Sequence, residues 1–226
     1  MQIIEIYRSI QGESSFAGVP CIFVRLAACN LRCVWCDSEY TFTGGKKMTS
    51  EEVEQEVVKL APSGLVEITG GEPMLQEREL VPLMERLLAR GYTLLLETSG
   101  ERPLEHVPPA VHKIVDVKCP GSGEGGTFRM GNLNLLTPRD EVKFVLADRA
   151  DYEFARDFTR QNGLETKAGG VIFSPAFRKD PSSQRDSRNC MLDPRVLAEW
   201  ILQDGFNVRL GLQLHKFIWE PAMKGV

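Results

Sequence analysis

The strongest constraint on the fold is an alternation of short aliphatic runs with amphipathic helical patterns along the 226 residues. The strand-like runs lie at residues 21–27, 65–69, 92–97, 112–118, 141–147, 170–174 and 208–214. Strands that alternate with helices predict parallel βαβ units with right-handed crossovers. About six such units are too few for a closed eight-stranded barrel. We therefore expect an α/β fold, an open and partial parallel β/α barrel.

Local signals place the ends of the predicted helices. Thr49 followed by Glu52 predicts a capping box at the start of one helix. Gly91 and Gly163 are positioned to end two others, because glycine accepts the left-handed conformation that closes many helices. Asp193 followed by Pro194 predicts the start of the last helix.

The unusual residues of the chain follow the predicted strands. They lie at residues 29–36, 70–73, 97–100, 118–119, 174–175 and 213–216. In parallel barrels the C-terminal ends of the strands form the working face, so these segments are expected to share one site. Two long loops leave the same rim, at residues 121–138 and 175–192. Loops of this length are usually lids or disordered segments, and both interpretations stay open.

Composition excludes several classes of protein. The formal net charge of −4 argues against nonspecific nucleic-acid binding. No apolar run approaches the roughly 18 residues that span a membrane, and the first residues lack the pattern of a signal peptide. The expected location is the cytoplasm. In that compartment the six cysteines favour a cluster, a metal or catalysis over disulfides.

Three cysteines crowd into one short run, Cys29, Cys33 and Cys36. Thiolates bind iron-sulfur clusters, and three of them on a four-iron cube leave one iron open for a substrate or cofactor. The alternatives are a zinc site and buried thiols. A structural zinc site needs four ligands, often as two CxxC knuckles, and the chain has no second knuckle. The spacing therefore favours a 4Fe-4S cluster.

A CxxxCxxC run after the first barrel strand, with Trp35 before the third cysteine, resembles the radical S-adenosylmethionine (radical SAM) superfamily. Residues 70–73 (GGEP) look like the second motif of that superfamily, which holds the methionine amino group of the cofactor. The resemblance implies a barrel of the radical SAM type and a cluster whose open iron binds S-adenosylmethionine. Reductive cleavage of that cofactor releases a 5′-deoxyadenosyl radical.

A narrower resemblance, to the 7-carboxy-7-deazaguanine synthases of queuosine and other 7-deazapurine biosynthesis, covers nearly the whole chain. The matching pieces are residues 11–13 (QGE), Arg25, 36–38 (CDS), Thr69, 97–100 (ETSG), 141–143 (EVK) and 213–216 (QLHK). That family is a carbon-nitrogen lyase that converts 6-carboxy-5,6,7,8-tetrahydropterin to 7-carboxy-7-deazaguanine with loss of ammonia. Its third cofactor is Mg²⁺, for which Ser38 matches the ligand position.

The resemblance also implies the site residues. Besides the cluster ligands, the residues expected to bind cofactor are Trp35, Asp37, Gly71, Glu72, Ser99, Asp116 and Lys118. Those expected to bind substrate are Ile10, Gln11, Gly12, Glu13, Arg25, Thr69, Gln213 and His215. The family usually has Ser-Pro-Lys where this chain has Asp116-Val117-Lys118, so only Lys118 matches cleanly.

Two substrate residues have a plainer interpretation. Arg25 is the lone charge of an apolar strand, where it is costly without a partner, so a substrate carboxylate is favoured over a surface ion pair. His215 could equally be a structural histidine at a strand end. Cys119 departs from the family pattern and is expected to be incidental.

Two other functions compete with the synthase. A glycyl-radical activase shares the cysteine spacing, but it acts on a protein rather than a small molecule. A noncatalytic iron-sulfur or zinc protein would need a fourth ligand, for which Cys119 is the candidate. We expect one domain, 1–226, with a substrate-binding N-terminal segment (1–20) and a C-terminal strand and tail (206–226). A homodimer and a reductant such as flavodoxin are the expected partners.

Overall fold

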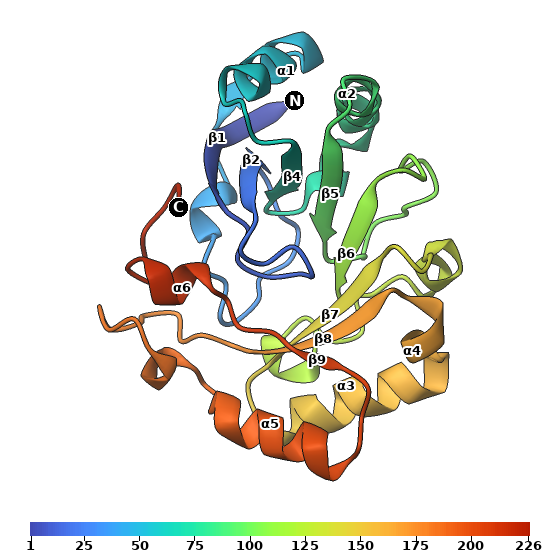
Figure 1. The fold of residues 1–226 in the computed structure, drawn as a ribbon, viewed down its shortest axis with the longest axis vertical. Coiled ribbons are helices and arrows are strands. Elements are labelled where there is room, and N and C mark those ends of the chain that lie inside the picture. The colour runs from blue at the N-terminus through green and yellow to red at the C-terminus, as the bar shows by residue number, and fades with distance from the viewer.

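The computed structural model describes residues 1–226, and its centre is a nine-stranded sheet in the order β3-β1-β2-β4-β5-β6-β7-β8-β9. The parallel strands are β2 (Pro20–Leu26), β4 (Leu65–Gly70), β5 (Thr93–Thr98), β6 (His112–Asp116), β7 (Glu141–Leu146), β8 (Gly170–Pro175) and β9 (Arg209–Leu210). The sheet curves around the interior without closing (Figure 1), so the predicted open parallel barrel is confirmed.

One edge of the sheet is antiparallel and was not expected. β1 (Gln2–Ile10) pairs with β2, and β3 (Lys46–Lys47) pairs with β1. β1 was missed because most of its side chains are only partly buried and it carries charged residues such as Glu5 and Arg8. The segment 1–20 is therefore a strand followed by a loop.

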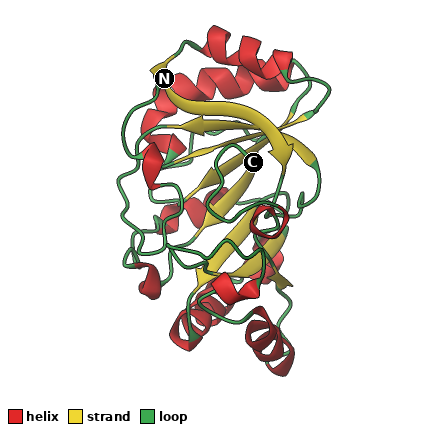
Figure 2. Cartoon of the chain, turned by 90° about the vertical axis from the view of Figure 1, so that its left-hand side faces the viewer, coloured by secondary structure: helices red, strands yellow, loops and turns green.

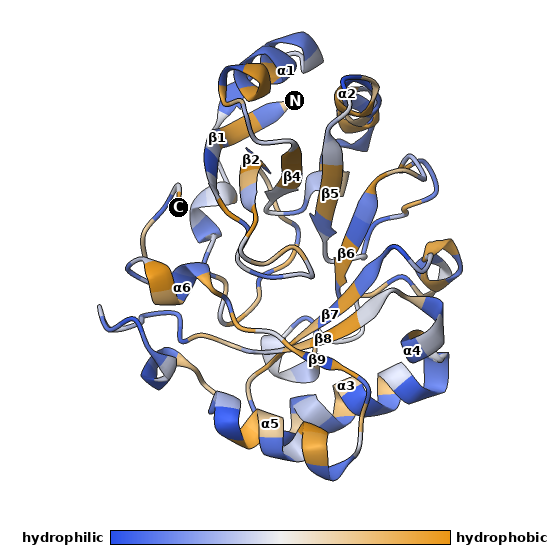
Figure 3. Cartoon of the chain, in the orientation of Figure 1, coloured by the Kyte–Doolittle hydropathy of each residue, from blue (hydrophilic) through white to orange (hydrophobic).

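The helices lie on the outer side of the curved sheet (Figure 2), as the βαβ order predicts. They are α1 (Ser50–Lys59), α2 (Glu77–Ala89), α3 (Arg149–Asn162), α4 (Leu164–Lys167) and α5 (Pro194–Gln203), while the short α6 (His215–Ile218) lies near the C-terminus. Hydrophobic and hydrophilic residues form separate stripes on several of these helices (Figure 3). The predicted caps are confirmed, because Thr49 and Glu52 form a capping box and Gly163 takes the left-handed conformation.

The alternation of side chains along each strand divides the core in two. Outward residues such as Val24 and Ile68 pack beneath the helices in a large cluster. Inward residues near the N-terminal ends of the strands form a second, small cluster of Cys21, Phe23, Leu65, Leu95 and Ile114. Tyr7 and Phe16 pack against this small cluster, so the N-terminal segment fills that end of the barrel.

The prediction of a final strand over 208–214 was wrong in length. Only Arg209–Leu210 pairs with β8, and α6 follows. The chain leaves the sheet there because Leu214 donates its backbone N–H to the carbonyl of Gly12 at 2.8 Å. The last segment thus packs on the N-terminal segment instead of extending the sheet.

Both long loops have defined structure. Residues 121–138 contain the 3-10 turns η3 (Pro120–Ser122) and η4 (Met130–Leu135). Residues 175–192 fold back through a bridge between Phe177 and Cys190. Asn189 accepts from the Ser182 backbone N–H at 2.8 Å and donates to its carbonyl at 3.0 Å. None of the helices combines the length and apolar character that crossing a membrane requires.

Candidate functional site

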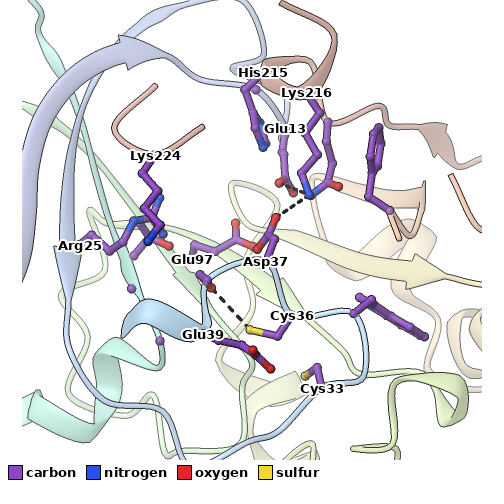
Figure 4. A pocket seen from close by; sticks show the side chains of 18 of the residues that line it. Glu13, Arg25, Cys33, Cys36, Asp37, Glu39, Glu97, His215, Lys216 and Lys224 are labelled. Atoms are coloured by element: carbon purple, nitrogen blue, oxygen red, sulfur yellow. Dashed lines mark hydrogen bonds and ion pairs between the residues drawn. The ribbon is translucent and has the colours of Figure 1, made fainter. Parts of the chain in front are cut away.

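A cavity of about 500 Å³ opens at the C-terminal ends of the parallel strands. Figure 4 shows side chains from the N-terminal segment, the cysteine loop, the strands and α6 converging on it. Every residue predicted for the site except Glu72 lines this cavity. They are Ile10, Gln11, Gly12, Glu13, Arg25, Cys29, Cys33, Trp35, Cys36, Asp37, Ser38, Thr69, Gly71, Ser99, Asp116, Lys118, Gln213 and His215.

The cysteine loop is held by the glycine pair that ends β4. A Cβ on Gly71 would lie 2.2 Å from the carbonyl oxygen of Ala28 and 2.7 Å from the Cβ of Cys29, so only glycine fits. The Glu72 backbone N–H donates to the same Ala28 carbonyl at 2.8 Å. The GGEP segment therefore supports the loop directly.

The three thiols of this loop differ from the other cysteines. Cys29, Cys33 and Cys36 are partly exposed to the cavity, whereas Cys21, Cys119 and Cys190 are buried. Burial raises the pKa of the Cys33 thiol to about 11, while Lys118 opposes this shift.

The arrangement of these thiols favours some occupants over others. No three His, Cys, Asp or Glu side chains converge closely enough to hold a single metal ion. A four-iron cube needs its ligands farther apart, so three partly exposed thiols on one short loop fit a cluster better than a mononuclear zinc. Cys119 packs in the large hydrophobic core, where burial raises its pKa. It therefore supplies no fourth ligand in this arrangement.

Residues 119–124 cover the outer side of the cysteine loop. The Val34 backbone N–H donates to the Ser122 carbonyl at 2.9 Å, and the Arg32 N–H donates to the Glu124 carboxylate at 2.5 Å. Residues 119–124 therefore support the loop of predicted cluster ligands from its outer side.

Glu72 lies beneath the cavity rather than in it. Its carboxylate accepts from the Met74 N–H, the Thr98 hydroxyl, and both the N–H and the hydroxyl of Ser99, at 2.7 to 3.0 Å. These four bonds match the acceptor capacity of a carboxylate. Glu72 therefore fixes the end of β5 in this structure, and its contact with a cofactor ammonium stays a prediction.

Asp116 and Lys118 project from the end of β6 into the cavity. The Lys118 ammonium donates to Asp116 Oδ2 at 2.8 Å. The other oxygen, Oδ1, is buried without a hydrogen-bond partner. A buried unpaired acceptor calls for a donor. The hydroxyl and ammonium groups of S-adenosylmethionine are such donors, so the site fits this cofactor.

A buried group of charges forms the floor of the cavity. The Lys143 ammonium on β7 lies 2.5 Å from Glu13, 2.5 Å from Glu97 and 3.7 Å from Asp116. Glu67 on β4 accepts from the Gln11 amide at 2.9 Å. Burial raises the pKa of Glu97 to about 8 and that of Glu67 to about 7, so these carboxyls can carry protons near neutral pH.

Glu13 behaves differently from its neighbours. Burial alone would raise its pKa, but the charge of Lys143, together with hydrogen bonds from Lys143 and Gln213, outweighs burial and lowers the pKa to about 2. The carboxylate also accepts from the Gln213 amide at 2.9 Å. Glu13 is therefore an ionised acceptor on the floor of the cavity.

Arg25 has partners within the chain. Its Nε donates to Glu5 at 2.9 Å and its Nη2 donates to the Tyr7 hydroxyl at 3.0 Å. Tyr40 also donates to Glu5, at 2.8 Å. Side chains of β1 thus offset the positive charge of Arg25. Its guanidinium borders the cavity, and its contact with a substrate carboxylate stays a prediction.

The C-terminal segment closes one side of the cavity. A Cβ on Gly12 would lie 2.4 Å from His215 Nδ1, so glycine allows the imidazole to pack there. Burial lowers the pKa of His215, which keeps the ring neutral near pH 7. The Lys216 ammonium lies 2.6 Å from Asp37, beside the last cluster ligand. Residues 221–226 also line the cavity, and the Lys224 ammonium lies over the Tyr40 ring.

Several lining residues were not among the predicted site residues, namely Tyr7, Phe23, Glu67, Tyr40 and Phe177, while Lys143 and Lys216 were singled out only as parts of the EVK and QLHK matches. For Glu67 and Lys143 a signal was present. Glu67 is the one ionisable residue of LVEITG, and Lys143 lies inside EVKFVL, whose other ionisable residue, Glu141, begins the strand. The reasoning applied to Arg25 would have found both.

Comparisons with known proteins identify the family of the chain. The model of the Radical SAM superfamily matches residues 24–119, which run from β2 to the end of β6 and contain the cysteine loop and GGEP. A 7-carboxy-7-deazaguanine synthase from Koribacter versatilis is 71% identical over 100% of both chains. One from Chlorobaculum tepidum is 44% identical over 100% of this chain and 97% of its own.

A solved structure shares the fold. The crystal structure of QueE from Escherichia coli superposes with a TM-score of 0.73 and 25% identity, covering 95% of this chain and 94% of that one. Full-length similarity, the cysteine loop and the cavity together lead to one conclusion: the chain belongs to the 7-carboxy-7-deazaguanine synthase family of radical SAM enzymes.

Proposed function

We propose that this chain converts 6-carboxy-5,6,7,8-tetrahydropterin to 7-carboxy-7-deazaguanine with release of ammonia. The observation that carries the proposal is the composition of the cavity. Three partly exposed cysteines border it on one side, and polar residues of the N-terminal and C-terminal segments border it on the other. A radical source and a small-molecule site thus share one enclosed space.

The polar residues suit the two ends of this substrate. The guanine-like edge of a pterin carries N–H donors, and Glu13 and Gln11 offer acceptors on the cavity floor. The pterin carboxylate needs a cation, which Arg25 supplies through its guanidinium. The neutral ring of His215 can accept or donate one hydrogen bond. Thr69, Ile10 and Gln213 complete the proposed substrate contacts.

When bound, the cluster and S-adenosylmethionine supply the radical that removes a hydrogen atom from the pterin C6. Cys29, Cys33 and Cys36 would hold the cluster. The proposed contacts of the cofactor are Trp35, Asp37, Gly71, Glu72, Ser99, Asp116 and Lys118. Ser38, whose hydroxyl lies 3.7 Å from the Cys36 sulfur, would give one ligand to Mg²⁺, with substrate oxygens needed to complete the shell.

An anaerobic assay tests the function. The reconstituted protein receives dithionite, S-adenosylmethionine, Mg²⁺ and 6-carboxytetrahydropterin, and mass spectrometry follows 7-carboxy-7-deazaguanine and 5′-deoxyadenosine. We expect product with the wild-type chain and none with Cys33→Ala. 5′-Deoxyadenosine without deazaguanine would overturn the pterin assignment and favour an activase. Neither product from a fully loaded cluster would favour a noncatalytic protein.

The remaining partners and the setting are proposals of the same kind. We propose that the chain works as a homodimer with a flavodoxin-like reductant in the cytoplasm, as the family resemblance implies. We also propose that it acts as one domain, 1–226, in which 1–20 and 206–226 bind substrate. Support comes from Gln11 and Gln213, which belong to these segments and both line the cavity. Size-exclusion chromatography with light scattering tests the dimer.

A further inference from the structure

We propose that Lys143 is a positioning residue of this reaction, which rests on the proposed function. Its ammonium holds Glu13 as an ionised acceptor on the cavity floor. In this role Lys143 selects substrates whose buried edge presents hydrogen-bond donors. The residue lies on β7, away from the cysteine loop and from the segments that carry most of the predicted substrate contacts.

The geometry places Lys143 at the centre of three elements. Its side chain is only 4% exposed, and its ammonium lies 2.5 Å from Glu13 of the N-terminal segment and 2.5 Å from Glu97 of β5. Asp116 of β6 lies 3.7 Å away. Glu13 in turn accepts from Gln213 of the C-terminal segment. One ammonium therefore joins both ends of the chain to the barrel.

The charges around Glu13 explain why Lys143 is needed. Glu67 and Glu97 raise the free-energy cost of a negative charge on Glu13, whereas the Lys143 ammonium offsets that cost. The ring of His215 is neutral near pH 7, because burial lowers its pKa. Lys118 is committed to Asp116 at 2.8 Å. Lys143 is therefore the cation that keeps Glu13 ionised, and without it burial would favour the protonated carboxyl.

The protonation state of Glu13 matters for recognition. An ionised carboxylate accepts two hydrogen bonds in parallel from neighbouring N–H groups, such as the amide and amino groups of a guanine-like edge. A protonated carboxyl offers one acceptor oxygen fewer, and its O–H donor faces an N–H donor of the substrate. A site built for hydrogen-bond donors rejects groups that lack them strongly, because its own buried groups are left unpaired.

The test uses Lys143→Met, which keeps most of the length of the side chain and removes its charge. We expect KM for the pterin, and Kd for the product 7-carboxy-7-deazaguanine measured by calorimetry without reductant, to rise at least about 30-fold. Because Glu13 then titrates, the loss should deepen as the pH falls from 8 to 6. Lys143→Arg should restore most of the affinity and remove this pH dependence.

Lys113→Met is the matched control. Lys113 forms an equally buried ion pair with Asp140 at 2.9 Å, outside the cavity. Lys113→Met should lower the thermal stability of the protein without changing KM for the pterin, Kd for the product or the pH profile of either. Equal effects of Lys113→Met and Lys143→Met on Kd would overturn the proposal, since the role would then be structural. A loss that is the same at every pH would overturn it as well.

A second variant keeps the test decisive. If Lys143→Met does not fold, Glu13→Gln removes the same carboxylate charge from the other side of the pair. It should weaken product binding at least about 30-fold, and wild-type affinity would overturn the proposal. The two proposals also fail differently. A wild-type chain that neither binds nor forms the deazaguanine refutes the function, whereas normal catalysis with an unaffected Lys143→Met refutes only the role of Lys143.

Discussion

The two ends of the barrel interior are built from the same strands but from different side chains. At the N-terminal ends the inward residues include Phe23, Leu65, Leu95 and Ile114, which pack against Phe16. The polar exceptions there are Glu141, which accepts from the Ser15 backbone N–H and anchors the N-terminal segment, and His112, which packs against Phe16. At the C-terminal ends most of the inward residues are polar or charged. Packing and chemistry are therefore separated along each strand rather than between strands.

This separation predicts which property of the protein a substitution at each end should change. A change at the packed end should lower the free energy of unfolding and leave substrate affinity intact at temperatures where the protein stays folded. A change at the cavity end should alter cluster binding, affinity or pH dependence with a smaller effect on folding. Paired substitutions at the two ends of one strand can break this division if it is wrong.

The largest effect is expected for Gly71→Ala, at the cavity end of β4. The added methyl would lie 2.2 Å from the Ala28 carbonyl and displace the cysteine loop. We expect bound iron to fall and activity to drop at least about 100-fold, as misplaced reactive groups do. Gly64→Ala, at the opposite end of β4 and with open space around it, is the control. Iron content that matches wild type in Gly71→Ala would contradict the support assigned to GGEP.

Leu95→Ala should have the next largest effect, at the packed end. This fully buried side chain belongs to the small inward cluster. Its removal should lower the free energy of unfolding of the apo protein by about 2–5 kcal/mol, measured in urea. KM for the pterin should stay unchanged below the unfolding temperature. A raised KM with unaltered stability would show that the two ends are not independent.

The pH dependence of the free energy of unfolding sharpens the comparison. The residue that it reports on is Glu67, which lies between the packed end and the cavity end of the barrel. Burial, partly offset by the Gln11 hydrogen bond, raises the pKa of this carboxyl to about 7 from 4.5. A carboxyl with a higher pKa in the folded chain stabilises it below pH 4.5, and that contribution is lost as the pH rises through 7. The free energy of unfolding should therefore fall between pH 5 and 8, by at most about 1.4 kcal/mol per pH unit.

Glu67→Gln should flatten this fall, because the amide does not titrate and can still accept from Gln11. Urea unfolding of the apo protein at pH 5, 6, 7 and 8 measures the slope for both chains. If the slope of the free energy of unfolding against pH is unchanged in Glu67→Gln, another group carries the proton. Glu97 is then the next residue to replace.

The smallest effect is expected for Val34→Ser, on the outer side of the cysteine loop. Val34 is 57% exposed and lies between two predicted cluster ligands. Stability should change by no more than about 0.5 kcal/mol, and iron content and dithionite-driven activity should match wild type. A clear loss of iron would mean that the loop depends on its outward face as well as on its inward thiols.

Local patterns predicted most of the fold. The capping box of Thr49 and Glu52 and the turn at Gly163 depend on neighbours a few residues away, and both are confirmed. The boundaries of β4 and β8 were within one residue of prediction because both are continuous apolar runs. β1 and the end of the last predicted strand were missed because distant partners decide them, as the bond between Leu214 and Gly12 illustrates.

The site was predicted from motifs rather than from geometry. The three cysteines and the two glycines of GGEP line the cavity, because both motifs follow parallel strands. What the motifs did not give was the charge pairing within the cavity. Lys143 and Glu13 are separated by 130 positions, and no local pattern links them. The role of Glu72 as a support for Ser99 likewise depends on how two strand ends meet.

The packing of the C-terminal segment on the N-terminal segment also affects the timing of events during protein synthesis. The cysteine loop leaves the ribosome well before the segment that pairs Lys216 with Asp37. At roughly 5–20 residues per second, the loop remains uncovered for on the order of ten seconds or more before that segment arrives. Delivery of iron and sulfide to a nascent chain would therefore meet an open loop, and translation itself would set the interval before the site is complete.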